Sequence, residues 1–144
     1  MLVLTQLFGF SVKNNVGQTL PKLEVKFTGE IPALGGKPLI VEFWATWCPS
    51  CRQSIPHLNE VYKKYKDKGL EILGVTKEDA ATVSAFTKEV TVTYPIALDP
   101  EAALAAHFGI TGLPHALLID KSGKIVWEGN PLDLKSADIE SLLK

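Results

Sequence analysis

Apolar residues fall into short runs that alternate between a strand-like and a helix-like pattern along the chain. Leu39–Trp44 (LIVEFW) and Leu70–Val75 (LEILGV) are almost continuously apolar. Such runs are typical of strands that are buried on both faces of a central, partly parallel sheet. Between them, from Cys48 onward, apolar side chains recur every three or four residues until Gly69. This spacing predicts a helix that ends at the glycine.

Further segments give an order in which strands and helices alternate first, and a hairpin and a helix follow. Pro56 is expected to kink the long helix, whose core-facing side chains are Ile55, Leu58, Tyr62 and Tyr65. The other predicted elements are, in chain order, an edge strand at 22–27, a helix at 79–90, a strand at 94–98, a short helix at 100–108, a hairpin of strands 115–120 and 124–128, and an amphipathic helix at 133–144 with Ile139, Leu142 and Leu143 inward. The sequence therefore predicts an α/β fold with a central mixed sheet flanked by helices on both faces.

Length and charge narrow the class of protein. The 144 residues suit one domain, with residues 1–20 as an N-terminal extension, and 46% are hydrophobic against 22% charged. The net charge of −1 gives no sign of nucleic-acid binding, and no apolar run reaches the roughly 20 residues of a transmembrane helix. Residues 1–10 (MLVLTQLFGF) are apolar, but the first positive charge, Lys13, follows them, whereas a signal peptide has its charge first. We expect this segment to pack on the domain.

The two cysteines, Cys48 and Cys51, are separated by two residues and are the only ones in the chain. A disulfide between them would close a very short loop and would remove little entropy from the unfolded chain. A purely structural disulfide is therefore unfavourable. The pair indicates either redox chemistry or metal binding.

The cysteine pair lies where a buried strand runs into the start of a helix. If Cys48 opens that helix, its sulfur faces unpaired backbone N–H groups and the positive end of the helix dipole, and both favour the thiolate. Pro49 then occupies the first helical position, where a missing N–H group is harmless. Cys51 lies one turn further on the same face, close enough to attack a disulfide formed by Cys48. We expect Cys51 to be the more buried of the two.

Glu42 is the only ionisable residue other than the cysteines between Leu39 and Cys51. On a strand it shares a face with Ile40 and Trp44, and burial there would raise its pKa to a range suited to proton transfer near neutrality. The residues alone leave a second interpretation equally open, in which Glu42 stands at a strand end with its carboxyl group in water.

Together these segments resemble the thioredoxin superfamily and, within it, the TlpA/ResA-like (Redoxin-type) thiol–disulfide oxidoreductases. The stretch VEFWATWCPSC at 41–51 carries the resemblance, with Pro56, Gly112-Leu113-Pro114 and the hairpin IDKSGKIV at 119–126 following in the family's order. The resemblance covers about residues 20–144. It implies a thioredoxin-like fold in which the stretch 77–93 corresponds to an extra helix–strand insertion before the C-terminal ββα part.

The resemblance also implies a role for each matched residue. Cys48 would attack a substrate disulfide, and Cys51 would resolve the mixed disulfide. Glu42 falls on the family's buried acidic position, which favours the proton-transfer interpretation. Pro114 is expected to be cis and packed against the disulfide, and Leu113 to offer backbone hydrogen bonds to an extended substrate.

Trp47 and Pro49 complete the expected substrate-binding surface, with Trp47 as a flat apolar wall beside Cys48 unless it packs in the core. Pro49-Ser50 stands where thioredoxin has Gly-Pro, at a position that tunes the reduction potential. We expect a protein-disulfide reductase that acts on protein or peptide disulfides and works as a monomer. Its cofactor would be the redox-active disulfide Cys48–Cys51 alone, reset by an upstream thiol reductase or oxidase. The location is cytoplasmic if Met1 is the native start, and periplasmic or facing the cell envelope if the chain has been shortened.

Other classes of function compete with this one. A metal-binding module would use both thiolates, but there is no second CxxC or histidine pair, and His57, His107 and His115 are scattered. A peroxidase of the peroxiredoxin type places Thr or Ser three residues, and Pro seven residues, before its reactive cysteine. Ala45 and Val41 hold these positions before Cys48, so the chain fits better as an electron donor within a peroxide-reducing system. A redox-silent binding domain is disfavoured because both cysteines are present.

His115 directly follows Pro114, where many relatives carry Thr. It is expected either to be an ordinary histidine at the start of a strand or to touch the cysteine site and make it sensitive to pH.

Overall fold

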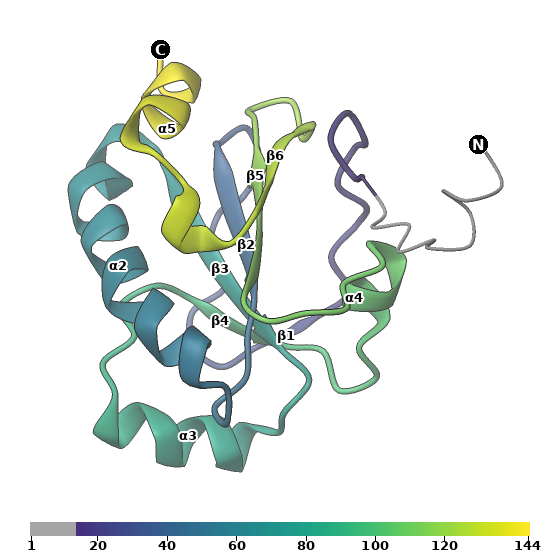
Figure 1. The fold of residues 1–144 in the computed structure, drawn as a ribbon, viewed down its shortest axis with the longest axis vertical. Helices are drawn as coiled ribbons and strands as arrows, with labels where there is room; N and C mark the ends of the chain where they lie inside the picture. The colour runs from purple at the N-terminus through teal and green to yellow at the C-terminus, as the bar shows by residue number, and fades with distance from the viewer. Residues whose placement is uncertain (1–13) are drawn as a thin grey trace, which may run out of the picture.

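The computed structural model describes residues 14–144, so the packing expected for residues 1–10 lies outside the described residues. Within this range a six-stranded sheet runs through the middle of the fold, with helices on both sides (Figure 1). The strands are β1 (Lys26–Phe27), β2 (Leu39–Phe43), β3 (Glu71–Thr76), β4 (Ile96–Leu98), β5 (His115–Ile119) and β6 (Ile125–Gly129). The helices are α2 (Pro49–Tyr65), α3 (Ala80–Glu89), α4 (Ala103–His107) and α5 (Ser136–Leu142), with short 3-10 helices η1 (Lys66–Lys68) and η2 (Pro131–Asp133).

The strand order gives the sheet the mixed character that the sequence predicts. The order is β1-β4-β3-β2-β5-β6. β3 pairs in parallel with β2 and β4, whereas β5 runs antiparallel to β2 and β6, and β1 runs antiparallel to β4. The two parallel connections contain α2 and α3, because a parallel crossover needs a long connection. The predicted hairpin is present as β5 and β6.

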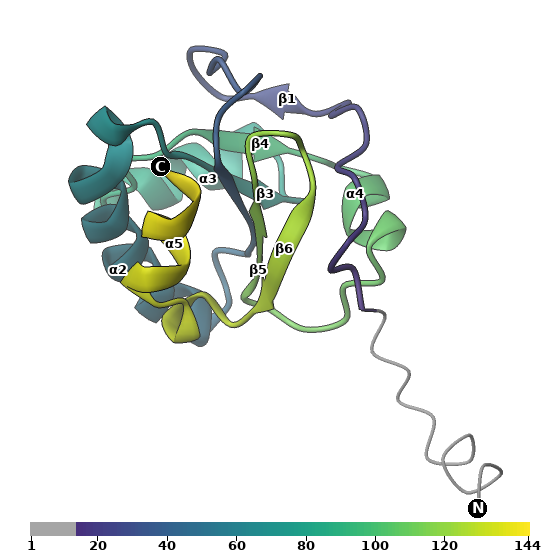
Figure 2. The ribbon, with the colours of Figure 1, turned by 90° about the horizontal axis from the view of Figure 1, so that it is seen from above.

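Alternate side chains of β2 enter two separate layers of the core, as the period of a strand requires. Ile40 lies in a cluster with side chains of α2 and α5, whereas Val41 and Phe43 lie in a cluster with a side chain of α4. Figure 2 shows α2 and α5 on one side of the sheet and α4 on the other. Every residue of β2 is buried, so the prediction of a strand covered on both faces is confirmed.

Helix α2 follows the pattern that predicts it. Cys48 is its N-cap and Pro49 its first residue. The helix passes into η1, which ends at Gly69, and the φ of 107° there is a left-handed conformation that glycine adopts without strain. The predicted core-facing residues are all buried: Ile55, Leu58, Tyr62 and Tyr65. Pro56 lies inside α2, and the kink expected there stays a prediction.

The edge strand expected at 22–27 is wrong for most of its length, because only Lys26 and Phe27 pair with β4. β4 has three residues and offers few partners. The alternation in this segment reflects packing instead, since Leu23 and Val25 are partly buried against the cluster on the α4 side of the sheet. An alternating pattern indicates which side chains are buried, but it is the same for a paired strand and for an extended loop that packs on the core.

The described N-terminal segment lies against the hairpin, and the last helix begins later than the sequence predicts. Residues 17–20, in the predicted N-terminal extension, lie along the start of β6, where the Gly17 N–H group donates to the Ile125 carbonyl at 2.8 Å. The last helix begins at Ser136, not Asp133, because Pro131 starts a separate 3-10 turn. The helix predicted at 79–90 is present as α3, whereas the helix predicted at 100–108 and the strand predicted at 94–98 are present only over the shorter ranges of α4 and β4.

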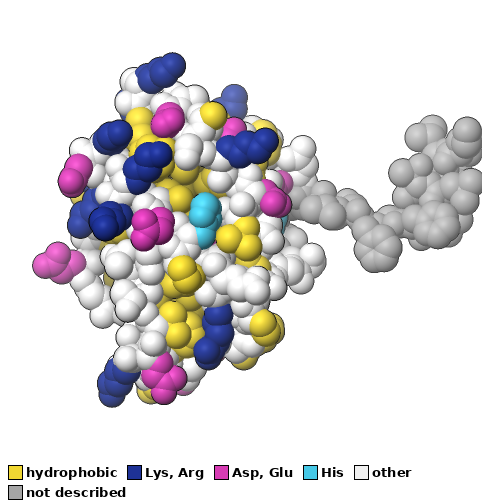
Figure 3. Space-filling model, turned by 60° about the vertical axis from the view of Figure 1, so that its left-hand side comes forward, with side chains coloured by type: hydrophobic (Ala, Val, Ile, Leu, Met, Phe, Trp, Pro, Cys, Tyr) yellow, Lys and Arg dark blue, Asp and Glu magenta, His cyan; other side chains and the backbone are white. Residues whose placement is uncertain are grey.

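Charged side chains of both signs are interspersed on the face shown in Figure 3, and hydrophobic side chains reach the surface between them. This face therefore carries no large patch of one sign, in agreement with a net charge of −1. In the part of the chain that the structure describes, none of the helices has the length and apolar character needed to cross a membrane.

Gly74 of β3 lies opposite Glu42 in the sheet, and two aromatic rings fill the space that a side chain would need. A Cβ atom at this position would lie 3.0 Å from Nε1 of Trp44 and 3.1 Å from Cε2 of Tyr94. We predict that Gly74→Ala lowers the free energy of unfolding in urea by about 1–3 kcal/mol, because these buried rings must move. The control is Gly35→Ala, since no atom lies within 4 Å of the added Cβ there. Equal losses in the two variants would contradict the packing argument.

Candidate active site

Cys48 and Cys51 lie at the junction of β2 and α2 that the sequence predicts. Cys48 is the N-cap of α2 in an extended conformation, with φ of −86° and ψ of 113°. Its Sγ accepts a hydrogen bond from the backbone N–H of Cys51 at 3.2 Å. This N–H is one of the donors that a helix leaves unpaired at its start, and it stabilises negative charge on the sulfur. Both residues are free thiols, and Cys51 is the more buried, at 0% exposed against 4% for Cys48.

The loop that leads into Cys48 is held from two sides. The carboxylate of Glu78 accepts hydrogen bonds from the N–H and the Oγ1 of Thr46, at 2.7 and 2.6 Å. Nε of Arg52 donates to the carbonyl of Thr46 at 3.1 Å. Trp47 follows with 66% of its surface exposed, so it is not a core residue, and its role as an apolar wall beside Cys48 stays a prediction. The anchored Thr46 fixes the backbone that presents Trp47 and Cys48.

Glu42 is wholly buried, so the interpretation with its carboxyl group in water is wrong. Its Oε2 accepts a hydrogen bond from Oγ of Ser54 at 3.1 Å, and its Oε1 has no hydrogen-bond partner within residues 14–144. Burial raises the pKa of Glu42 from 4.5 to about 8, and the hydrogen bond from Ser54 opposes this rise in part. The carboxyl group can therefore gain or lose a proton near neutral pH.

In addition to burial, the negative charge of Glu42 helps to raise the pKa values of two other groups, the Cys51 thiol and the Tyr94 hydroxyl. Burial raises the pKa of the Cys51 thiol well above its ordinary 9.0, and its hydrogen bond with Cys48 raises it further. Burial likewise raises the pKa of Tyr94 well above 10.0, and the neighbouring charges of Glu42 and Cys51 add to the effect. Cys51 therefore stays protonated at neutral pH and needs a base before it can act as a nucleophile.

The loop before β5 lies against the cysteines, as the resemblance implies. The peptide bond between Leu113 and Pro114 is cis, and Pro114 is buried. The Sγ of Cys48 donates to the Leu113 carbonyl at 3.8 Å, and Leu113 itself is half-buried. Pro49, in the first turn of α2, is exposed. Trp47, Pro49 and Leu113 thus surround the edge of Cys48, while their contacts with a substrate stay predictions.

His115 forms a hydrogen-bonded contact with β6. Its Nε2 lies 3.0 Å from Oε2 of Glu128, whose carboxylate also accepts hydrogen bonds from the N–H of Asn15 at 2.6 Å and from its Nδ2 at 3.0 Å. Burial alone would raise the pKa of Glu128, but the hydrogen bonds from Asn15 and His115 outweigh it and lower the pKa. The hydrogen bonds from Asn15 to Glu128 join the N-terminal segment to the hairpin, and an effect of His115 on the cysteines stays a prediction.

Two of the competing functions, a metal-binding module and a peroxidase, find little support in the geometry. Within residues 14–144 no three His, Cys, Asp or Glu side chains lie close enough to hold a metal ion, so the described residues offer the cysteines no third ligand. Val41 and Ala45, which hold the two positions that a peroxiredoxin would give to Pro and to Thr or Ser, are buried apolar residues. Neither side chain offers a hydrogen bond to a peroxide.

Sequence reasoning does not identify Ser54 or Glu78, although both hold predicted residues in place. Ser54 lies three residues after Cys51, and its Oγ contacts both Oε2 of Glu42 and the Cys51 carbonyl, the latter at 2.9 Å. A serine on the buried face of a helix needs a polar partner, and that signal was available. Glu78 gives no comparable signal, because its partner Thr46 belongs to a different loop.

Comparison with known proteins agrees with this geometry. The sequence profile of the AhpC/TSA family matches residues 16–128. The chain is 32% identical over 142 residues to the thiol-disulfide oxidoreductase ResA of Bacillus cereus, a match that covers 89% of this chain and 82% of that protein. The ResA of Geobacillus kaustophilus is 32% identical over 139 residues, which cover 87% of this chain and 80% of that protein.

Solved structures show the same likeness. The thioredoxin domain of a thiol-disulfide oxidoreductase from Bacteroides vulgatus matches with a TM-score of 0.76 at 26% identity, over 90% of this chain and 98% of that one. A thiol:disulfide interchange protein of the thioredoxin family from Chlorobium tepidum matches with a TM-score of 0.73 at 27% identity, over 91% and 99% of the two chains. With its close pair Cys48 and Cys51, the chain therefore belongs to the AhpC/TSA family as a TlpA/ResA-like thiol–disulfide oxidoreductase of the thioredoxin superfamily.

Proposed function

We propose that this chain reduces disulfide bonds, with Cys48 as the attacking residue. Protein disulfides are the substrate class that membership of the family implies. The observation that carries the proposal is the hydrogen bond of 3.2 Å from the Cys51 N–H to the Cys48 Sγ. It stabilises a thiolate on Cys48 and keeps the second cysteine within one helical turn of the first. The Cys48–Cys51 pair carries both electrons, so the reaction uses no metal or organic cofactor.

The exchange has two steps. The Cys48 thiolate attacks a sulfur of the substrate disulfide, so that a Cys48–substrate bond forms, the substrate bond breaks and one substrate thiolate leaves. The Cys51 thiol then gives its proton to Glu42 and attacks the sulfur of Cys48. The Cys48–Cys51 disulfide forms, and the second substrate thiolate leaves and takes up a proton. The substrate gains the two electrons that the cysteine pair loses.

The surroundings of Cys48 suit an extended polypeptide. Trp47 and Leu113 border the edge of Cys48 from two different loops, and Pro49 is exposed beside them. An extended substrate segment pairs with the backbone at Leu113 as an added strand does in other complexes, and Pro114 packs against the reacting sulfurs. An upstream thiol reductase returns the pair to the dithiol form. One chain carries every residue of this mechanism, so the exchange needs no second copy, and we propose that the protein works as a monomer.

The reduction potential of the Cys48–Cys51 pair tests the direction of exchange. Equilibration against glutathione or dithiothreitol buffers should give one reversible two-electron transition close to about −270 mV, the value of a reductant such as thioredoxin. A transition near about −120 mV would mean that the protein oxidises its partners. A protein without any reversible two-electron transition would not be a dithiol exchanger.

A further inference from the structure

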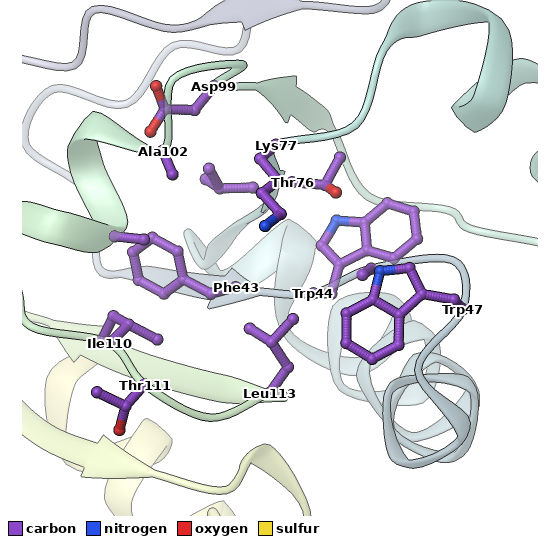
Figure 4. Close-up of a pocket in the computed structure, with 13 residues that line it drawn as sticks. Phe43, Trp44, Trp47, Thr76, Lys77, Asp99, Ala102, Ile110, Thr111 and Leu113 are labelled. Carbon is purple, nitrogen blue, oxygen red and sulfur yellow. The ribbon is translucent and has the colours of Figure 1, made fainter.

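A cavity of about 310 Å³ lies between the ends of β2 and β3, helix α4 and the loop before β5 (Figure 4). Its lining is mostly apolar and includes Phe43, Val75 and Ile110. Two further lining residues, Trp47 and Leu113, are the ones that border the edge of Cys48. A substrate bound to Cys48 therefore passes the mouth of the cavity. The volume lies at the lower end of the range for ligand pockets and suits one or two side chains of a polypeptide.

Lys77 places a positive charge in this apolar lining. Figure 4 shows its side chain among the residues of the cavity, with the nitrogen in the space between Phe43 and Trp44. Lys77 follows the end of β3 and is exposed to solvent in the unbound protein. Water therefore solvates its ammonium group until a substrate covers the cavity.

The acidic residues near Lys77 are already engaged. Asp99 is buried at another wall of the cavity, and its Oδ2 accepts the N–H of Leu104 at 2.7 Å. Both carboxylate oxygens of Glu78 accept hydrogen bonds from Thr46, and one of them also accepts from Thr76. No ion pair of Lys77 occurs within residues 14–144, where the one ion pair found joins His115 to Glu128.

We propose that this cavity selects protein disulfides in which an acidic side chain lies close to the reactive cysteine. The inference rests on the proposed function. An occupant that covers the cavity removes water from the Lys77 ammonium, and a buried charge without a partner is strongly unfavourable. A carboxylate on the occupant pairs with the Lys77 ammonium and offsets this loss of hydration, while a second ammonium group would be repelled. The apolar walls favour a hydrophobic side chain next to the acidic one. Lys77 is thus a residue that determines specificity, and the attack itself stays with Cys48.

Peptide disulfides with one varied position test this selection. The position directly before or directly after the peptide cysteine carries Glu, Gln or Lys. The full-length reduced protein is mixed with each peptide in a single turnover at low ionic strength, and the free peptide thiol is measured after acid quenching. In at least one of the two series, the Glu peptide should react about fivefold faster than the Gln peptide, and the Lys peptide more slowly. Added salt should remove most of the difference.

Variants assign the preference to one side chain. Lys77→Gln should bring the Glu and Gln rates together, Lys77→Arg should keep the preference, and Lys77→Glu should invert it in favour of the Lys peptide. The control is Lys88→Gln, which removes the same charge from an exposed position on α3 outside the cavity and should keep the preference. Equal rates for Glu and Gln peptides with the unchanged protein, or a preference that survives Lys77→Gln, would overturn the inference alone. A protein that reduces none of the peptides would overturn the proposed function with it.

Discussion

Cys48→Ser is expected to lower the rate of disulfide reduction by about 1000-fold or more, because a hydroxyl group is a far weaker nucleophile than a thiolate. The structure favours Cys48 as the first nucleophile on two grounds. Its sulfur accepts the Cys51 N–H at the start of α2, and 4% of its surface is exposed, whereas Cys51 has none. A substrate sulfur therefore reaches Cys48 first. Single-turnover reduction of a peptide disulfide by the pre-reduced variant measures the loss.

Cys51→Ser is the matched control, since it makes the same chemical change one helical turn away. This variant should still attack the substrate but should stop at the mixed disulfide, because the residue that resolves it is missing. Mass spectrometry under non-reducing conditions should find one substrate chain attached to Cys48. A stable adduct in Cys48→Ser and none in Cys51→Ser would reverse the order assigned to the two cysteines.

The parts of the fold that could be predicted are those determined by neighbours along the chain. The apolar run of β2, Pro49 at the first position of α2 and Gly69 at the end of η1 each give a local signal. These signals place Cys48 at a helix N-terminus before any tertiary contact is known. The geometry of the cysteine pair follows from that placement, because helical spacing alone brings the Cys51 N–H toward the Cys48 sulfur.

Contacts between distant segments could not be predicted in the same way. The carboxylate of Glu78 anchors Thr46, which lies 32 positions earlier in the chain, and no local pattern links the two residues. The apolar alternation at 22–27 predicted a paired strand, but the short β4 leaves most of that segment without a partner strand. Both outcomes depend on which neighbours the tertiary fold supplies.

The burial of Glu42 could not be predicted from the sequence for the same reason. The strand pattern sets which face of β2 it occupies, but burial depends on what covers that face. The cover comes from Ser54 on α2 and from the Tyr94 ring, which Gly74 on β3 leaves room for. The residues alone could not decide between a buried and a solvated carboxyl group, whereas the packed structure does. The raised pKa, and with it the capacity for proton transfer, is thus a property of the tertiary fold.

Glu42→Gln is expected to slow the second step of exchange by about 100-fold at pH values above 8, because glutamine cannot accept the Cys51 proton. In the unchanged protein this rate should rise with pH through about 8, as the carboxyl group ionises. The variant should lose that rise while it keeps the first step. Rapid-quench measurements at saturating substrate separate the two steps, because the first then no longer limits the rate. An unchanged pH profile would assign the proton to another acceptor.

The ionisation of Glu42 should also appear in the stability of the reduced protein. At pH values below 4.5 the carboxyl group is protonated in both the folded and the unfolded chain, so it contributes no pH dependence. Between 4.5 and about 8 only the unfolded chain releases the proton, so the free energy of unfolding falls as the pH rises, and above about 8 the loss is complete. A pKa raised from 4.5 to about 8 corresponds to a loss of about 5 kcal/mol in the free energy of unfolding.

Urea unfolding of the reduced protein and of Glu42→Gln, compared at each pH, isolates this contribution from that of other titrating groups. The variant does not titrate at residue 42, so its stability relative to the unchanged protein should increase by about 5 kcal/mol between pH 4.5 and about pH 9. Ser54→Ala removes the hydrogen bond that lowers the pKa of Glu42, so it should move this dependence to higher pH. A difference that stays constant over the whole range would mean that Glu42 ionises as it does in water. In that case Glu42 would be a carboxylate throughout the working range, and the rate of the second step should not rise with pH through about 8.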